Sequence, residues 1–333
     1  MPTVPLGVLD QSPVPEGATG GDALRNTIDL AQFTEGLGFT RYWLAEHHAT
    51  PALAGPSPEV LIGPVAAATE RIRVGSGGVM LPHYSPLKVA ESFSVLSGLF
   101  PGRIDLGIGR APGTDRQTAL ALQRDRRQAT PDDFPEQLDE LLRYLRDDFP
   151  PGHPLSRLAA LPGRPEVPEL WLLGSSADSA AWAAEGGLAY AFADFINPQG
   201  AACAHAYRRA AVEPRVAVAV SALCAETAEE AQYLAASWRA AFELMLRGRL
   251  IPVPAPERAL RILAQLGLDP KVAPANRRAI VGDPETVSAG IEAVAREYGA
   301  DEAIVVTITH DHQARRRSYQ LIAHQLRSRV TVR

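Results

Sequence analysis

Three consecutive polar residues, Glu46, His47 and His48, combine side-chain types that transfer protons near neutral pH. Adjacent histidines on an extended segment point to opposite faces, so they do not readily bind the same metal ion. From the residues alone we therefore predict that His47 or His48 forms a polar wall or a proton relay, with Glu46 beside it, and that there is no metal site.

Serines at the start of a predicted helix form a second candidate site. Gly174, Ser175, Ser176 and Ser179 join this helix to the strand before it, and amides and hydroxyls at a helix N-terminus can hold a phosphate. The guanidinium of Arg110, which follows another predicted strand, would supply the matching charge. The alternatives are a simple N-cap for the serines and an ordinary surface position for Arg110. The Gly-x-Ser-x-Gly pattern of a nucleophilic serine is not formed.

Glycines follow two further predicted strands, in the run Ser76, Gly77, Gly78, Val79 and at Gly109. A residue without a Cβ atom lets the backbone come close to a flat ligand, and the alternative is a tight turn at the strand end. The run does not satisfy the Gly-x-Gly-x-x-Gly pattern of a dinucleotide site.

All these residues follow short β-rich runs that alternate with longer helical patterns along the chain. We predict one α/β domain over residues 1–333, a (β/α)8 TIM barrel, with an open doubly wound sheet as the alternative. The active site of such a barrel lies at the C-terminal ends of its strands. The predicted strands are Leu6–Asp10, Arg41–Ala45, a third that begins with Ile72–Gly75, Ile104–Ile108, Leu170–Leu173, Leu188–Phe192, Arg215–Cys224 and Ala303–Thr307. The predicted helices are Asp22–Leu37, Pro58–Thr69, Pro86–Leu99, Pro135–Arg146, Ala177–Glu185, Ala228–Leu246, Pro284–Tyr298 and Ala314–Arg327.

Two segments interrupt this alternation. Prolines are frequent over residues 150–168, which indicates an irregular but ordered loop. The segment 248–280 contains the Pro- and Arg-rich stretch Leu250–Arg278, which fits no simple strand–helix unit. We expect it to be an irregular insertion near the seventh and eighth units of the barrel.

The composition is that of a globular protein, with 46% hydrophobic residues, 21% charged residues and a net charge of −5. This balance argues against nucleic acid and against an anionic membrane surface as partners. The basic run Arg315–Arg317 is interpreted as the solvated start of a helix.

Without a signal-peptide pattern or a long apolar run, the protein is expected in the cytoplasm. Cys203 and Cys224 are too few for a disulfide framework, and buried packing is their expected role.

Several segments resemble the bacterial luciferase-like monooxygenase superfamily, in the right order and on the right predicted strands. Leu9–Pro15 and Leu81–Pro86 are most similar to the single-chain bacterial members of this superfamily. The four segments that carry the broader resemblance are Trp43–His48, Arg73–His83, Pro101–Arg110 and Trp171–Ser176.

The resemblance implies an FMN site. It implies a cis peptide between Gly77 and Gly78 beneath the isoalloxazine ring. It also aligns His47 with the catalytic histidine of luciferase, so we expect His47 to transfer protons, with Glu46 and His48 as its catalytic neighbours. It also implies that the insertion is a mobile lid, which would screen a reactive flavin from water. The residues aligned with the phosphate contacts of the family are Arg110, Ser175, Ser176 and Ser179.

The sequence departs from luciferase at two positions. Gly109 stands where luciferase has a reactive cysteine, so no mechanism through that thiol is expected. Ser175 replaces a glutamate of the phosphate loop, so a backbone contact is expected there rather than the glutamate's side-chain contact.

The activity implied by the resemblance is that of a monooxygenase. Reduced FMN, delivered by a separate flavin reductase, would react with O₂, and an aldehyde or another small apolar organic substrate would be oxygenated. No NAD(P)H site is recognisable in the sequence, which favours this two-component arrangement. The family also implies a homodimer. The alternatives to the monooxygenase activity are F420-dependent hydride transfer on the same fold and a non-catalytic flavin-binding protein.

Overall fold

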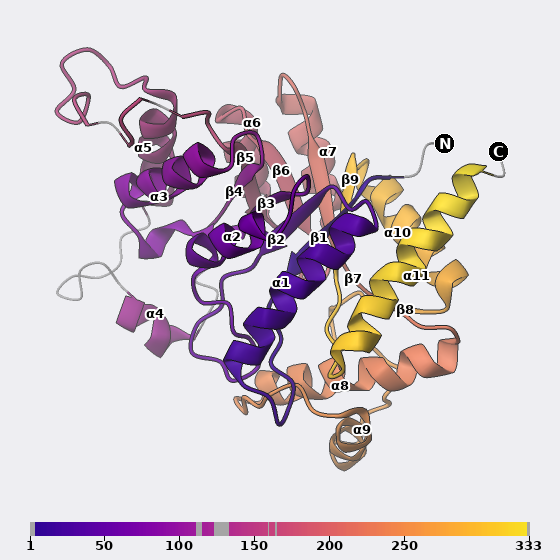
Figure 1. Ribbon diagram of the computed structural model, residues 1–333. Helices are drawn as coiled ribbons and strands as arrows, with labels where there is room; N and C mark the ends of the chain where they lie inside the picture. The colour runs from indigo at the N-terminus through magenta and orange to yellow at the C-terminus, as the bar shows by residue number, and fades with distance from the viewer. Residues whose placement is uncertain (1–3, 111–114, 123–132, 159, 164, 332–333) are drawn as a thin grey trace.

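The computed structural model describes residues 4–110, 115–122, 133–158, 160–163 and 165–331. Eight parallel strands close into a barrel, which confirms the predicted (β/α)8 architecture (Figure 1). These strands are β1 (Leu6–Asp10), β2 (Arg41–Leu44), β3 (Arg73–Met80), β4 (Ile104–Gly109), β5 (Glu169–Gly174), β6 (Ala189–Ala193), β7 (Val216–Cys224) and β9 (Glu302–Val306). Each strand pairs with the next in this order, and β9 pairs with β1.

All eight predicted helices are present in the structure, and four of them have the predicted bounds. Residues with strong end signals set several of these bounds; Asp283, for example, caps the N-terminus of α10 through the amide of Thr286, and Gly299 ends it in the left-handed conformation. The helices are α1 (Gly20–Gly36), α2 (Pro58–Ala67), α3 (Pro86–Leu99), α5 (Phe134–Arg146), α6 (Ala177–Glu185), α8 (Ala228–Leu246), α10 (Pro284–Tyr298) and α11 (His312–Thr331).

The structure also contains elements that the sequence patterns do not predict. Helix α7 escapes prediction because only two of its ten residues, Ala204 and Tyr207, are buried, so its apolar periodicity is weak. The unpredicted elements are η1 (Leu81–His83), α4 (Arg116–Leu122), α7 (Ala201–Ala210), α9 (Pro256–Gln265) and β8 (Ile280–Gly282).

The insertion between β7 and β9 is more regular than expected. The stretch Leu250–Arg278 contains helix α9, which buries Ala259 and Leu263 in one cluster with Ala236 and Ala240 of α8. The strand β8 that follows pairs in parallel with the end of β7, outside the closed barrel. The expectation of an irregular stretch is wrong for these residues, because the amphipathic face of α9 finds a partner on α8.

The barrel interior is filled by aromatic and small side chains. Along β2, Arg41 and Trp43 point inward, whereas Tyr42 and Leu44 pack against the surrounding helices. The rings of Trp43 and Trp171 meet edge to face with centroids 5.3 Å apart, which is a favoured geometry for aromatic pairs. Small residues of the same interior cluster leave room for these rings: Ala45, Ala191, Ala217 and Ala219.

A network of paired charges closes the N-terminal end of the barrel. The guanidinium of Arg41 lies 2.5 Å from Asp105 and 2.7 Å from Glu302, and its carbon lies 4.7 Å from the ring centroid of Trp171. The indole of Trp43 donates a hydrogen bond to Asp105 over 2.9 Å. Because these groups fill the interior of the barrel at its N-terminal end, a ligand that enters the barrel would do so at the C-terminal ends of the strands.

Arg315 corrects the interpretation of the basic run as a solvated helix start. Its side chain is buried, and its guanidinium lies 2.6 Å from Asp10 at the end of β1. Burial alone would raise the pKa of Asp10, but Arg315 and the hydroxyl of Tyr42 hold that pKa below its ordinary value. The start of α11 packs against the barrel, so this charge is paired rather than hydrated.

The proline-rich loop over residues 150–168 and the two cysteines can also be compared with their predictions. The described residues of the 150–168 loop form turns but no helix or strand, and residues 159 and 164 lie outside the described part. Cys224 is buried and Cys203 is partly buried, and both are free thiols. No helix in the described part of the chain is long and apolar enough to cross a membrane.

Candidate active site

A cavity of about 540 Å³ opens at the C-terminal ends of the strands. Its walls combine apolar interior residues, such as Trp43 and Leu173, with polar residues from the strand ends. Eight of the ten residues predicted to bind a cofactor line this cavity, together with Glu46 and His47. The eight are Gly77, Gly78, Gly109, Arg110, Gly174, Ser175, Ser176 and Ser179.

One end of this cavity, which we call the serine cradle, is formed by Ser175, Ser176, Ser179 and Arg110. Ser176 is the N-cap of α6 and forms a capping box with Ser179, so the N-cap interpretation is correct for this residue. Capping does not exclude a ligand, because the first-turn amides of a helix have no partner within the helix and the helix dipole favours an anion there. The exposed guanidinium of Arg110 lies 5.4 Å from the ring centroid of Trp182, also on the cavity wall. These donors form a suitable site for a phosphate group.

Another part of the wall is backbone. The peptide between Gly77 and Gly78 is cis, as the family resemblance implies, and the pairing of β3 with β4 shifts register between Ser76 and Val79. A Cβ atom on Gly77 would lie 2.6 Å from a methyl of Leu9 and 2.9 Å from Cβ of Trp43. Glycine is therefore required at this position by its packing against Leu9 and Trp43.

Two predicted residues lie outside the cavity lining. The hydroxyl of Ser76 is fully buried, donates to the carbonyl of Gly107 over 2.8 Å and accepts from its amide over 3.0 Å. Val79 is buried in the core between the barrel and its helices. Both side chains thus stabilise the glycine segment of β3 from behind rather than contacting a ligand.

His47 lines the cavity with a polar atom that has no partner. Its Nδ1 atom is buried and makes no hydrogen bond within the described part of the chain, while its backbone amide donates to Gly55 over 2.9 Å. Burial, with the charge of His48 as a second cause, lowers the pKa of His47 to about 4. At neutral pH the imidazole is uncharged and can accept a proton.

Glu46 and His48 are arranged differently from His47. The carboxylate of Glu46 is buried, lies 2.7 Å from Nε2 of His48, and accepts hydrogen bonds from the amide of Met80 over 2.9 Å and the hydroxyl of Tyr84 over 3.0 Å. His48 is absent from the lining of the cavity. The three predicted catalytic residues are therefore divided, with His47 facing the cavity and His48 held behind it.

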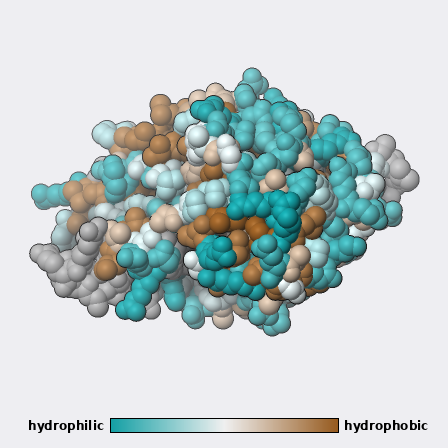
Figure 2. Space-filling view, turned by 90° about the horizontal axis from the view of Figure 1, so that it is seen from below, coloured by the Kyte–Doolittle hydropathy of each residue, from teal (hydrophilic) through white to brown (hydrophobic). Residues whose placement is uncertain are grey.

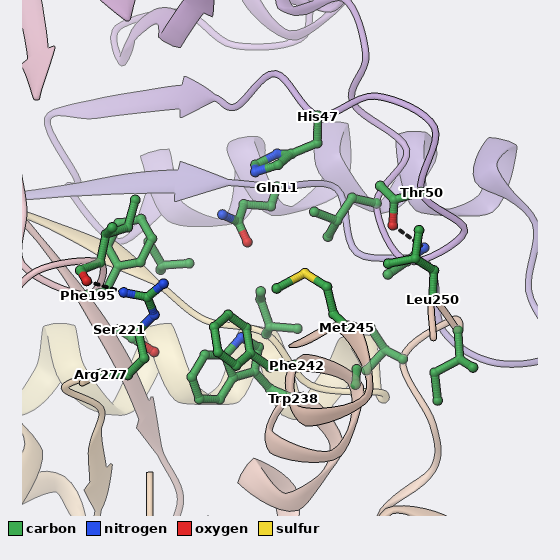
Figure 3. Close-up of a pocket in the computed structure, with 18 residues that line it drawn as sticks. Gln11, His47, Thr50, Phe195, Ser221, Trp238, Phe242, Met245, Leu250 and Arg277 are labelled. Carbon is green, nitrogen blue, oxygen red and sulfur yellow. Dashed lines mark hydrogen bonds between the residues drawn. The ribbon is translucent and has the colours of Figure 1, made fainter. Parts of the chain in front are cut away.

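A second cavity of about 250 Å³ adjoins the first (Figure 3). The residues that line both cavities are Gln11, His47, Phe195 and Ile196. The remaining walls come mostly from α8 and the insertion. At its rim, Ile196, Met245 and Leu250 are exposed although apolar. On the face seen from below in Figure 2, hydrophobic residues gather in a hollow ringed by hydrophilic ones, as expected for such a rim.

Sequence reasoning missed most residues of this second cavity. Trp238, Phe242 and Met245 form an apolar stripe on α8 with helical spacing, a signal that ordinarily indicates core packing. Arg277 lies in the insertion, where no periodicity pointed to it. Of the candidate site residues named from the sequence, only His47 reaches this cavity, where it is joined by Gln11, which directly follows β1.

Some other polar residues that follow strands are absent from the lining of both cavities. Asp194 is buried 3.6 Å from the guanidinium of Arg278, and burial raises its pKa. His312 lies 2.7 Å from the carboxylate of Asp29, and Nε2 of His310 lies 3.2 Å from a backbone carbonyl. Within the described residues, no three His, Cys, Asp or Glu side chains are placed to hold a metal ion.

A parallel barrel with a glycine wall, a serine cradle and a histidine at its C-terminal end is the arrangement expected of a cofactor-dependent enzyme. A family model described as luciferase-like monooxygenase matches residues 4–302. The chain therefore belongs to the luciferase-like monooxygenase family.

Several relatives are similar to this chain over nearly their full length. The chain is 46% identical to the uncharacterized protein YwcH of Bacillus subtilis (strain 168), over 96% of this chain and 98% of that protein. It is 38% identical to N-acetyl-S-alkylcysteine monooxygenase of the same organism, over 96% and 97% of the two chains. The crystal structure of apo-MsnO8 superposes with a TM-score of 0.87 at 40% identity, covering 97% of this chain and 98% of that one.

More distant solved structures share the fold, and the cofactors that they are described with differ from one structure to the next. The oxygenating constituent of 3,6-diketocamphane monooxygenase from Pseudomonas putida, in complex with FMN, has a TM-score of 0.74 at 21% identity and covers 97% and 98% of the two chains. An F420-dependent secondary alcohol dehydrogenase has a TM-score of 0.64 at 15% identity and covers 96% and 99%. At such identities the likeness concerns the fold alone.

Proposed function

We propose that this protein is a flavin-dependent monooxygenase that uses reduced FMN and O₂ to oxygenate a small, largely apolar organic substrate. The observation that carries this proposal is the joining of two cavities at His47. One cavity combines a flat backbone wall with a phosphate-type cradle, and the other is apolar and open at its rim. A flavin in the first cavity would thus meet a substrate in the second beside a neutral imidazole.

The residues of the first cavity fit FMN in shape and charge. Gly77 and Gly78 offer backbone without side chains to a planar ring, and the serine cradle offers amides, hydroxyls and the Arg110 guanidinium to a phosphate. When bound, reduced FMN would supply the activation of oxygen. F420 also carries a phosphate, so the same cradle would accept it, and hydride transfer with F420 is the second candidate.

The side chains near the junction have distinct roles in this proposal. His47 accepts a proton at a ring nitrogen, because its Nδ1 atom is unpaired and the ring is uncharged at neutral pH. Glu46 and His48 act as positioning residues, since their mutual contact and the bond to Met80 hold the segment that presents His47. Apolar residues of α8 and the insertion exclude water, which gives the insertion the function of a lid.

Two partners complete the proposal. A separate flavin reductase would supply the reduced cofactor, and a second copy of the chain would form a homodimer. Exposed apolar side chains on α2 and α3, at Val60, Val95 and Leu99, support a contact between copies at these helices. Sedimentation analysis checks this contact, because Val60→Glu should shift a dimer toward monomer.

The decisive experiment compares the two cofactors. Reduced FMN and reduced F420 are titrated into the protein without oxygen, and the complex is then mixed with oxygenated buffer while its absorbance is followed. We expect micromolar or tighter binding of FMN and a transient absorbance band before reoxidation. Binding of F420 alone, or reoxidation of FMN as fast as in free solution, would overturn the proposal. A substrate screen then starts from aldehydes and from N-acetyl-S-alkylcysteines, the class named for a relative.

A further inference from the structure

Arg277 is the only side chain with a permanent charge among the eighteen residues that line the second cavity. No aspartate or glutamate belongs to this lining in the described part of the chain. His47, the only other ionisable side chain there, is neutral at pH 7 because burial lowers its pKa to about 4. The second cavity therefore presents one positive charge within apolar walls.

The charge of Arg277 is not balanced by an acid of the protein. Its guanidinium donates to the backbone carbonyl of Ile196 and lies 5.4 Å from the ring centroid of Phe242, and no ion pair to it occurs among the described residues. The adjacent Arg278 is different, because it lies 2.7 Å from Glu297 and 3.6 Å from Asp194. A guanidinium has five N–H donors, so Arg277 retains donors for a further acceptor.

The position of Arg277 within the cavity also matters. Figure 3 shows Arg277 near Phe195 and the pair Trp238 and Phe242, whereas His47 lies on the other side of the cavity. The indole and phenyl rings of that pair are stacked with centroids 5.2 Å apart. A molecule that extends from Arg277 to His47 would thus lie along apolar walls and would meet a polar side chain of the protein at each end.

We infer that the second cavity selects substrates that carry a carboxylate at one end, which Arg277 binds, and an apolar part that extends toward His47. This inference rests on the proposed function for its assignment of the second cavity as the substrate site, and it adds the substrate class. A carboxylate matches the planar fork of a guanidinium, and such pairs are stronger than neutral hydrogen bonds. The group that reacts would lie at the apolar end, beside the flavin cavity.

A matched pair of probes tests the inference without flavin or oxygen. Binding of 4-phenylbutyrate and of its neutral analogue 4-phenylbutanamide is measured by calorimetry on the full chain at pH 7.5. We expect the carboxylate to bind wild type at least about tenfold more tightly than the amide, as a charge-assisted pair provides. In Arg277→Gln the two affinities should agree within about twofold, and Arg277→Lys should retain part of the preference. Arg249→Gln, which changes an exposed arginine of the same insertion, should behave as wild type.

Each other outcome contradicts the inference. The contradicting results are equal affinities in wild type, no binding of either probe, and a loss of both affinities in Arg277→Gln. Each of them would mean that Arg277 serves only as a structural contact to Ile196 and Phe242. Binding of FMN to each variant is measured separately. A carboxylate preference without FMN binding would refute the proposed function alone, and FMN binding without the preference would refute this inference alone.

Discussion

The carboxylate of Glu46 lies 2.7 Å from Nε2 of His48, while the residue between them, His47, leaves its Nδ1 atom without a partner. Glu46 also accepts hydrogen bonds from Met80 and Tyr84, so it ties the end of β2 to the end of β3 and to the residues beyond it. This arrangement turns His48 away from the cavities and presents His47 to both of them.

Glu46→Gln should destabilise the fold. The amide retains one acceptor but weakens the charge-assisted contacts to His48 and Met80, and their buried polar atoms lose part of their pairing. We expect urea denaturation to show a loss of about 1–3 kcal/mol in the free energy of unfolding. Glu91→Gln, which removes only a surface pair with Lys88, serves as the control and should change stability by less than about 0.5 kcal/mol. Equal effects of the two substitutions would refute a special role for Glu46.

The stability of the protein should depend on pH through His47. Its pKa falls from 6.5 to about 4 in the folded chain, so between these values the unfolded chain binds more protons at this residue. The free energy of unfolding therefore decreases as the pH falls from 6.5 toward 4. Because the side chain is only partly buried, we expect a loss of about 1–2 kcal/mol between pH 7.5 and pH 5. Urea titrations of wild type and His47→Asn measure this difference, and parallel pH dependences in the two proteins would contradict it.

His47→Asn should also reduce turnover. An asparagine at this position retains polar atoms but cannot accept a proton as imidazole does, so we expect kcat to fall by about 100-fold or more. The measurement is product formation with the first substrate that the screen identifies, with reduced FMN supplied in excess. FMN affinity is the control and should change little. A turnover within about threefold of wild type would assign proton transfer to another group.

Arg110→Gln tests the phosphate end of the first cavity. The exposed Arg110 contributes little to the fold, but its loss should weaken FMN binding by about tenfold or more, because a charge-assisted contact disappears. Riboflavin has the same ring system without the phosphate, so its affinity should be the same in both proteins. Fluorescence titration with the two flavins measures both constants. Equal weakening of FMN and riboflavin would show that Arg110 does not act through the phosphate.

Gly77→Ala tests the backbone wall. The added methyl would lie 2.9 Å from Cβ of Trp43, an atom that cannot move without the barrel core, so we expect a loss of about 1–3 kcal/mol in stability and weaker FMN binding. Gly98→Ala in α3 is the matched control, because its methyl would be 3.6 Å from the nearest atom and alanine favours a helix. Thermal denaturation measures both variants. Equal stability of the two variants would contradict the packing argument.

Much of the fold is encoded in local patterns. The alternation of Arg41, Tyr42, Trp43 and Leu44 fixes which face of β2 points into the barrel, because successive side chains of a strand point to opposite sides. The site residues that directly follow strands were predictable for a different reason, because parallel strands bring their C-terminal ends to one edge. Helix α7 was not predictable, because few of its residues are buried.

The sequence by itself determined the barrel, the family and residues of both the backbone wall and the serine cradle of the first cavity, including Gly77, Arg110 and Ser176. Tertiary structure alone decided that His47 rather than His48 faces the cavities and that Arg315 is buried against Asp10. It also decided that Arg277 lines a cavity shared with His47. These facts depend on contacts between segments far apart in the chain, and no local periodicity encodes such contacts. Local periodicity specifies elements, whereas packing of the closed barrel specifies which side chains meet.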